Sequence, residues 1–167
     1  LSVVPLTTHL EIKNVTNKIS FDLIKVKTLT INKYYKKLFG KEPRIIVLGL
    51  NPHNSEDKIN SIESKIIAPS IINLQKLGIN IRGPYPADTA FSNQKKLKYD
   101  LIIGMYHDQV LAPFKALFGY DAINITLGLK YLRISPDHGT AKDIIGLNKA
   151  NPESLLSAIN FLNKIND

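Results

Sequence analysis

Cysteine is absent from all 167 residues of the chain. Disulfide bonds, a thiolate nucleophile and a cysteine-ligated zinc site are therefore excluded, and we expect a cytoplasmic protein because a reducing compartment suits this composition. No apolar run approaches the roughly 18–20 residues that span a bilayer, so we expect no membrane partner. Residues 1–5 contain neither an initiating Met nor a basic signal region. They resemble the interior of a strand, and we therefore expect a fragment of a longer protein.

A dinucleotide-binding Gly-x-Gly-x-x-Gly is also missing after every predicted strand. The net charge of +8, from 22 Lys and Arg against 14 Asp and Glu, favours anionic ligands. The lysines are scattered, however, and no dense basic arm or RNA-binding aromatic signature accompanies them. A solvated, lysine-rich surface without a nucleic-acid partner explains this pattern better. A non-catalytic anion or nucleic-acid binding module is the alternative.

The remaining composition, 44% hydrophobic and 22% charged, suits a compact globular domain or a large part of one. Apolar runs predict strands at residues 2–8, 44–50, 79–82, 99–106 and 122–127. Helical periodicity predicts helices at 21–38, 59–77, 111–118 and 152–165, with residues 83–89 as a rigid loop. Strands that alternate with helices predict a doubly wound or related α/β sheet.

Sequence signals also predict how three of these helices begin or end. Ser20 is the expected N-cap of the first long helix, and Gly40 its end. Pro69 should kink the second helix or begin a new segment. Asn151 should cap the last helix, whose buried side we expect to be lined by Leu155, Ile159, Leu162 and Ile165.

Three of the four histidines follow the end of a predicted strand, namely His9, His53 and His107. If the strands are parallel, all three lie at the edge of the sheet where ligands bind. Three neutral imidazoles can hold a divalent transition metal such as zinc. The alternative is that they are ordinary loop histidines, because no short metal-ligand spacing links them. The sequence leaves both interpretations open.

Charged residues near these histidines are further candidates. Asp88 and Asp108 could orient a histidine or a metal-bound water, although a turn residue and a helix N-cap are the alternative roles. Lys115 and Arg133 offer positive charge for a phosphate or carboxylate. Lys115 follows His107 by eight residues, about two helical turns, which places it near the same rim.

Six ordered motifs resemble those of the 4-hydroxythreonine-4-phosphate dehydrogenase family of pyridoxal 5'-phosphate (vitamin B6) biosynthesis. They are TTHL at 7–10, GLNPH at 49–53, GPYPADT at 83–89, MYHDQ at 105–109, NITLGL at 124–129 and DHGTA at 137–141. The resemblance implies NAD- or NADP-dependent oxidation of 4-phosphooxy-L-threonine. Decarboxylation to 3-amino-2-oxopropyl phosphate follows. A related metal-dependent dehydrogenase of another phosphorylated or carboxylated hydroxy acid is the alternative enzyme. The resemblance also implies a three-layer α/β/α fold like that of isocitrate and isopropylmalate dehydrogenases.

The same resemblance assigns a divalent metal, zinc, magnesium or cobalt, to His9, His53 and His107. The third histidine would come from the other subunit of a homodimer. Such a metal would lower the pKa of the reacting hydroxyl and stabilise the enolate that forms as carbon dioxide leaves. The proton would pass to Asp88, Asp108 or a metal-bound hydroxide, and the resemblance does not decide between them.

Positions that would contact the phosphorylated substrate are Lys115, Asn124 and Arg133. A segment resembling the adenine-binding loop of isocitrate and isopropylmalate dehydrogenases supplies the expected cofactor contacts, which are His138, Gly139, Thr140, Ala141 and Asn151. We therefore expect residues 1–120 to form the interface and metal-binding part. Residues 121–167 should form the last part of a cofactor-binding domain.

Three departures from the family qualify this assignment. Residues 54–58 replace a glycine-rich run, and the loop beside His53 should be shaped differently. Val110 stands where the family usually has Gly, so the backbone conformation beside His107 should differ from that of the family. The family enzyme is about twice as long as this chain, so the chain alone should have little or no activity.

Overall fold

The computed structural model describes residues 1–119 and 121–166, and the chain divides into two units, Leu1–Pro113 and Phe114–Asp167. The first unit contains β1 (Ser2–Thr7), α1 (Ile12–Lys18), α2 (Phe21–Phe39), β2 (Ile45–Leu48), η1 (Pro52–Asp57), η2 (Glu63–Ile67), α3 (Ala68–Lys76), β3 (Ile81–Tyr85), α4 (Ala87–Ala90), α5 (Gln94–Leu97) and β4 (Leu101–Tyr106). Helix α6 (His107–Phe118) carries the chain into the second unit, which contains β5 (Ile123–Thr126), β6 (Arg133–Pro136), η3 (Lys142–Ile144) and α7 (Glu153–Asn166). The boundary therefore falls inside α6, a few residues before the expected position.

A four-stranded parallel sheet in the order β1-β4-β2-β3 forms the centre of the first unit. All four residues of β2 and the first five of β4 are buried, as expected for inner strands covered on both faces. The predicted parallel α/β arrangement is confirmed for this unit.

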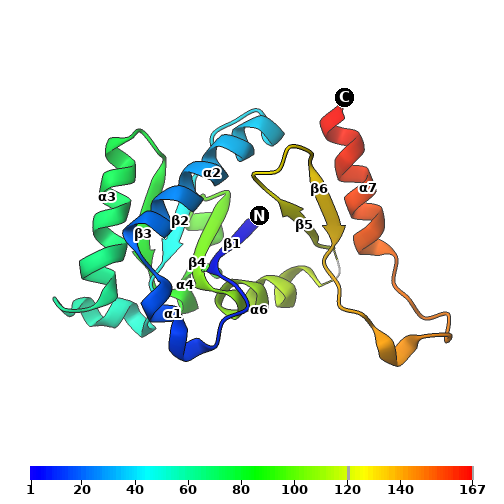
Figure 1. Ribbon diagram of the computed structural model, residues 1–167, viewed down its shortest axis with the longest axis horizontal. Helices are drawn as coiled ribbons and strands as arrows, with labels where there is room; N and C mark the ends of the chain where they lie inside the picture. Colours follow the sequence, from blue (N-terminus) through cyan, green and yellow to red (C-terminus); the bar gives the residue numbers. More distant parts are fainter. Residues whose placement is uncertain (120, 167) are drawn as a thin grey trace. The chain divides into compact units, whose positions relative to one another are not determined.

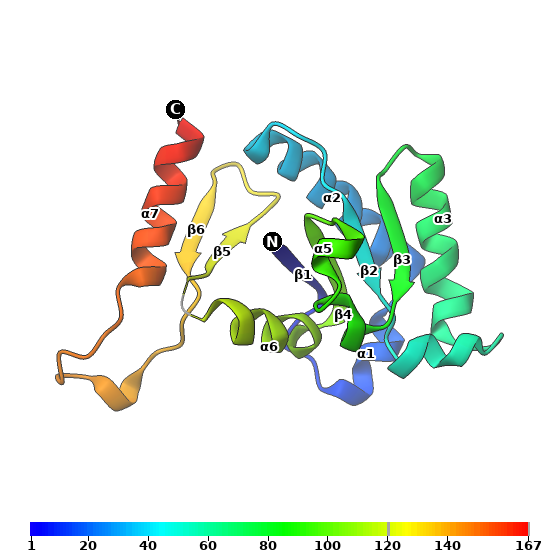
Figure 2. The same cartoon turned by 180° about the vertical axis from the view of Figure 1, so that it is seen from behind.

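Helices cover both faces of this sheet. Helix α2 lies in front of the sheet in Figure 1, and α5 lies in front of it when the molecule is viewed from behind in Figure 2. Side chains alternate along the strands, so Ile46 and Leu48 join Val110 in a buried cluster on one face. The first unit is thus a three-layer α/β/α structure.

The long helix α2 forms as its end signals predict. Ser20 Oγ accepts a hydrogen bond from the Leu23 backbone N at 3.2 Å. Gly40 adopts the left-handed conformation, with φ of 67°, and its N–H bonds to the carbonyl of Lys36. Both ends therefore have the caps that satisfy backbone groups without helical partners.

Several predicted boundaries are wrong. The helix predicted from residue 59 begins at Glu63, and Ile59 is 86% exposed. A new segment, α3, begins at Ala68 with Pro69 in its first turn, as expected. Residues 83–85 of the predicted loop extend β3. Pro84 is tolerated there because β3 is an edge strand whose register against β2 is irregular at this point. Helix α6 starts four residues before the predicted helix, and α1 and β6 were not predicted.

Val110 adopts the ordinary helical conformation within α6 and is fully buried. Its side chain lies against Gly104 of β4, where an added Cβ would collide with the Val110 Cγ1. Val110 is thus a core side chain, and the backbone beside His107 is regular helix.

The second unit is an antiparallel β5–β6 hairpin that packs against α7. Asn151 caps α7 as predicted, because its Oδ1 accepts from the Glu153 backbone N at 2.8 Å. The predicted buried side is wrong. Leu155 and Ile159 are 50% and 46% exposed, while Ser154 and Ala158 are buried. Small residues face the hairpin because it approaches closely enough for Ser154 Oγ to donate to the carbonyl of Ala122.

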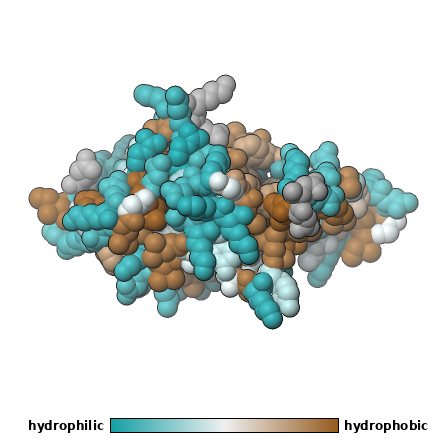
Figure 3. Space-filling view, turned by 90° about the horizontal axis from the view of Figure 1, so that it is seen from above, coloured by the Kyte–Doolittle hydropathy of each residue, from teal (hydrophilic) through white to brown (hydrophobic). Residues whose placement is uncertain are grey.

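The surface mixes polar and apolar groups. Figure 3 shows hydrophilic and hydrophobic residues interspersed over one face of the molecule. Within the part of the chain that the structure describes, no helix combines the length and the apolar character required to cross a bilayer.

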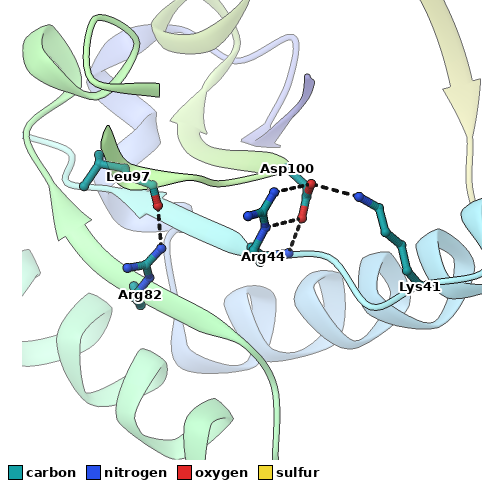
Figure 4. Close-up of polar contacts among 5 residues, drawn as sticks. All are labelled: Lys41, Arg44, Arg82, Leu97 and Asp100. Carbon is teal, nitrogen blue, oxygen red and sulfur yellow. Dashed lines mark hydrogen bonds and ion pairs between the residues drawn. The ribbon is translucent and has the colours of Figure 1, made fainter. Parts of the chain in front are cut away.

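A carboxylate joins the starting ends of the inner strands (Figure 4). Asp100, whose side chain is 11% exposed, accepts hydrogen bonds from the Arg44 backbone N at 2.9 Å and side-chain Nε at 2.8 Å. Lys41 Nζ lies 3.1 Å away. The Arg44 side chain, opposed by partial burial, holds the pKa of Asp100 well below its usual range. These bonds fix β4 against β2 at the end of the sheet opposite the histidines.

We expect Asp100→Asn to lower the free energy of unfolding by about 2 kcal/mol, because it removes charge-assisted hydrogen bonds. The folded-state pKa of Asp100 lies below the roughly 3.9 of an unfolded Asp, so its contribution is complete above that value and is lost as pH falls through the folded pKa. Urea denaturation should show a constant difference from the parent chain between about pH 5 and 7 that shrinks below about pH 4. Asp143→Asn, an exposed carboxylate, is the control. This account is contradicted if the difference in free energy of unfolding between Asp100→Asn and the parent chain does not change with pH.

Candidate functional site

The carboxyl ends of three neighbouring parallel strands carry the three candidate metal ligands. His9 follows β1, His107 follows β4 and His53 follows β2, and these strands are adjacent in the order β1-β4-β2. All three histidines therefore lie at the same edge of the sheet, as the sequence predicts for parallel strands.

Two of these histidines approach each other directly within one chain. The ring centroids of His9 and His107 are 6.1 Å apart, with an angle of 44° between the rings. Asp108 Oδ1 lies 2.7 Å from His107 Nδ1. Because an ionised carboxylate only accepts hydrogen bonds, Nδ1 carries the proton, and Nε2 is left with a lone pair that can bind a metal. The predicted orienting role of Asp108 therefore has the required geometry.

The donor set suits a divalent transition metal. A Zn–N bond is about 2.1 Å long, so two imidazoles on one ion have ring centroids roughly 5–6 Å apart. The His9 and His107 rings are close to that separation. Among the side chains that the structure describes, no group of three His, Cys, Asp or Glu is placed to hold an ion within one chain.

His53 lies in a backbone turn of unusual conformation. Its φ is 50°, and the next three residues also have positive φ. The buried Glu63, which we did not predict, binds this turn: its carboxylate accepts from the backbone N–H groups of Leu50 and Asn51 at 3.0 and 2.8 Å, and from Ser55 Oγ at 2.7 Å. Burial alone would raise the pKa of Glu63, but these hydrogen bonds outweigh burial and lower it. The group is therefore ionised at neutral pH.

Side chains also tie the strand ends to one another. Thr7 Oγ1 at the end of β1 donates to the carbonyl of Met105 in β4 at 2.8 Å. Gln109 accepts from the Met105 backbone N and donates to the carbonyl of Gly49, both at 2.7 Å. These bonds connect β1, β4 and the turn after β2. No sequence signal marks such partners, because each interaction joins residues that only the folded sheet brings together.

Asp88 lies in the first turn of α4, just after the edge strand β3. It is exposed. Because β3 is parallel to β2, Asp88 follows the same edge of the sheet as His53. The structure places it at this edge without bringing it into hydrogen-bond contact with a histidine.

The candidate substrate residues belong to the second unit. Directly opposite residues of the hairpin share a face, and Asn124 pairs with Ser135 while Thr126 pairs with Arg133. Asn124 and Arg133 are therefore on the same polar face of the ribbon. Arg133 donates to Thr126 Oγ1 at 3.2 Å. Lys115 Nζ lies 3.5 Å from Asp137 Oδ2, and its side chain is 47% exposed.

The candidate cofactor residues surround the short η3 segment. His138 Nδ1 donates to the carbonyl of Gly139 at 3.0 Å, since a carbonyl can only accept. Ala141 adopts a left-handed conformation, with φ of 46°, directly before η3. Thr140 is exposed, and both polar atoms of the Asn151 side chain bond Glu153 at the start of α7. Asn151 thus has a structural role in addition to any contact with a cofactor.

Comparison with known proteins gives a consistent result. The family described as pyridoxal phosphate biosynthetic protein PdxA matches residues 1–162. A 4-hydroxythreonine-4-phosphate dehydrogenase of Bradyrhizobium diazoefficiens is 44% identical over 167 residues, which are 99% of this chain and 48% of the relative. The crystal structure of a 4-hydroxythreonine-4-phosphate dehydrogenase from Klebsiella pneumoniae has a TM-score of 0.84 and 34% identity, covering 99% of this chain and 51% of that one.

A terephthalate 1,2-cis-dihydrodiol dehydrogenase from Burkholderia xenovorans is also similar, with a TM-score of 0.73 and 27% identity over 96% of this chain and 51% of that one. The chain spans about half the length of the relatives that it matches. Its parallel sheet agrees with the isocitrate and isopropylmalate dehydrogenase-like fold of these neighbours. The chain belongs to the pyridoxal phosphate biosynthetic protein PdxA family.

Proposed function

We propose that the chain is the carboxyl-terminal half of a metal- and NAD(P)-dependent 4-hydroxythreonine-4-phosphate dehydrogenase. The observation that carries this proposal is the placement of His9, His53 and His107 after three neighbouring parallel strands, at one edge of the sheet, with Asp108 on His107 Nδ1. Similarity to the named relatives over nearly the whole chain supports the reaction class. The product would serve pyridoxal 5'-phosphate biosynthesis.

His9, His53 and His107 would hold the metal, which is zinc, magnesium or cobalt. The bound ion would supply a Lewis acid that favours ionisation of the substrate hydroxyl and stabilises negative charge during decarboxylation. Asp108 keeps His107 in the tautomer that leaves Nε2 free to bind. The chain would act as a homodimer around this site, with His107 of the partner subunit as the third ligand.

The second unit would bind the negatively charged phosphate of the substrate. The ammonium of Lys115 and the guanidinium of Arg133 suit a phosphate, and Asn124 adds an amide on the same face as Arg133. Residues 138–141 and Asn151 would contact the nicotinamide cofactor, which accepts the hydride while the protein positions it. Asp88 is exposed at the sheet edge and, with Asp108, is a candidate to take the hydroxyl proton.

The activity can be tested with the 167-residue chain alone and fused behind the amino-terminal half of the Bradyrhizobium diazoefficiens relative. We expect little or no NAD reduction by the chain alone. The fusion should reduce NAD with 4-phosphooxy-L-threonine but not with its unphosphorylated form or a terephthalate dihydrodiol. Lys115→Met should raise KM about 10–100-fold through loss of a charged hydrogen bond, whereas Lys130→Met, an exposed control, should not. Equal turnover without the phosphate would contradict the proposed substrate.

The shared metal site can be tested by mixing variant subunits. If His107 is supplied across a two-fold dimer, each heterodimer of His9→Ala and His107→Ala chains regains one intact site, so a random mixture should bind Co²⁺ at about one quarter of its sites. A mixture of His9→Ala and His53→Ala chains is the control, because both of its sites stay incomplete. Recovery in neither mixture, with full binding by the unsubstituted chain, would show that each site lies within one chain.

A further inference from the structure

The turn that carries His53 has a backbone conformation that its residues disfavour. Four consecutive residues, His53, Asn54, Ser55 and Glu56, have φ between 50° and 57°. None is Gly, and left-handed backbone brings the Cβ of an L-residue too close to the following carbonyl. A run of this kind persists only where the surrounding structure enforces it.

The Glu63 carboxylate binds the turn on both sides of His53. The Glu63 residue is 3% exposed. Before the histidine, its Oε1 accepts from the backbone N–H groups of Leu50 and Asn51 and from Asn51 Nδ2 at 3.1 Å. After the histidine, Ser55 Oγ donates to its Oε2 at 2.7 Å. One buried anion therefore closes the turn around His53.

Asn54 provides a second constraint on the same turn. Its Nδ2 donates to the carbonyl of Pro84 at 3.0 Å, and its Oδ1 is buried without a hydrogen-bond partner in the structure. The Asn54 Oδ1 lies over Gly49, where any Cβ would collide with it. The turn is thus held between the end of β2 and the end of β3.

We propose that Glu63 is a positioning residue for His53, which it holds at the metal-binding edge by enforcing the left-handed turn. In this chain residues 54–58 contain no glycine, so the carboxylate enforces a backbone shape that glycine would adopt without strain. The test of this inference by metal affinity rests on the proposed function. The test by the conformation of the turn does not.

Two conservative variants separate the effect of the length of the Glu63 side chain from the effect of its charge. Glu63→Gln keeps the length of the side chain and a carbonyl oxygen that can accept from Leu50 and Asn51, but it loses the charge. Glu63→Asp keeps the charge and is one methylene shorter, so its carboxylate does not reach the Leu50 and Asn51 N–H groups. Glu56→Gln removes an exposed carboxylate of the same turn and is the charge control.

Co²⁺ titration of the chain should show Glu63→Asp weakening metal affinity about 10–100-fold, as expected when a group that orients a ligand is displaced. Glu63→Gln should weaken it less, and Glu56→Gln should leave it nearly unchanged. Hydrogen exchange followed by NMR should accelerate at least about tenfold for the Leu50 and Asn51 amides in Glu63→Asp, while amides of β4 keep their protection.

The Glu56→Gly substitution should rescue metal affinity in Glu63→Asp, which it would not do if Glu63→Asp merely lowered the stability of the chain. Glu56 is exposed and has φ of 51°, so Glu56→Gly relieves the backbone strain without removing a buried contact. We expect Glu56→Gly to restore part of the Co²⁺ affinity that Glu63→Asp loses.

Two results would overturn the inference. One is a larger loss of affinity in Glu63→Gln than in Glu63→Asp, which would mean that charge and not placement matters. The other is unchanged exchange of the Leu50 and Asn51 amides in Glu63→Asp. Failure of the proposed function gives a different result, because the unsubstituted chain then binds no Co²⁺ while the exchange comparison still decides the role of Glu63.

Discussion

Parallel pairing of β4 with both β1 and β2 is the constraint on which the candidate site depends. It brings the carboxyl ends of three strands together, so His9, His53 and His107 reach one edge although they lie far apart in the chain. Asp100 and Arg44 fix the opposite end of the same strands, and Thr7 and Gln109 tie the ends beside the histidines. A shift of one residue in this register would turn the strand side chains to the other face of the sheet.

The turn after β2 shows how a chain can depart from the composition of its family and still present a ligand. Residues 54–58 lack the glycines that the family usually has there, yet the backbone is left-handed from His53 to Glu56. A buried carboxylate and a buried amide hold this conformation. Val110 is a similar case, because the packing of its side chain against Gly104 replaces a glycine with core contacts. In both places a histidine at the sheet edge lies beside residues that are held by buried side chains.

Much of the first unit was predictable because its signals are local. Ser20 and Gly40 mark the ends of α2, and continuous apolar runs mark β2 and β4. The buried side of α7 was not predictable from its leucines, because the close approach of the hairpin selects Ser154 and Ala158 instead. Likewise α6 begins at His107, where the sequence is polar and the apolar pattern has not yet started.

The position of the candidate site was more predictable than the contacts that hold its residues in place. Parallel strand ends predict where the histidines gather, and the motifs of the family predict their role. The Glu63 carboxylate and the Gln109 bridge could not be predicted, since a Glu in the first turn of a helix has the same local sequence whether it is solvated or buried. Their partners become neighbours only after the sheet has formed.

The most direct test of the account is Co²⁺ titration of the purified chain and of His9→Ala, His53→Ala and His107→Ala, with His138→Ala as a control outside the sheet edge. The account predicts one ion per subunit for the parent chain and for His138→Ala, and loss of binding in each of the other three. Binding that survives all three substitutions would contradict a metal site built from the three strand ends.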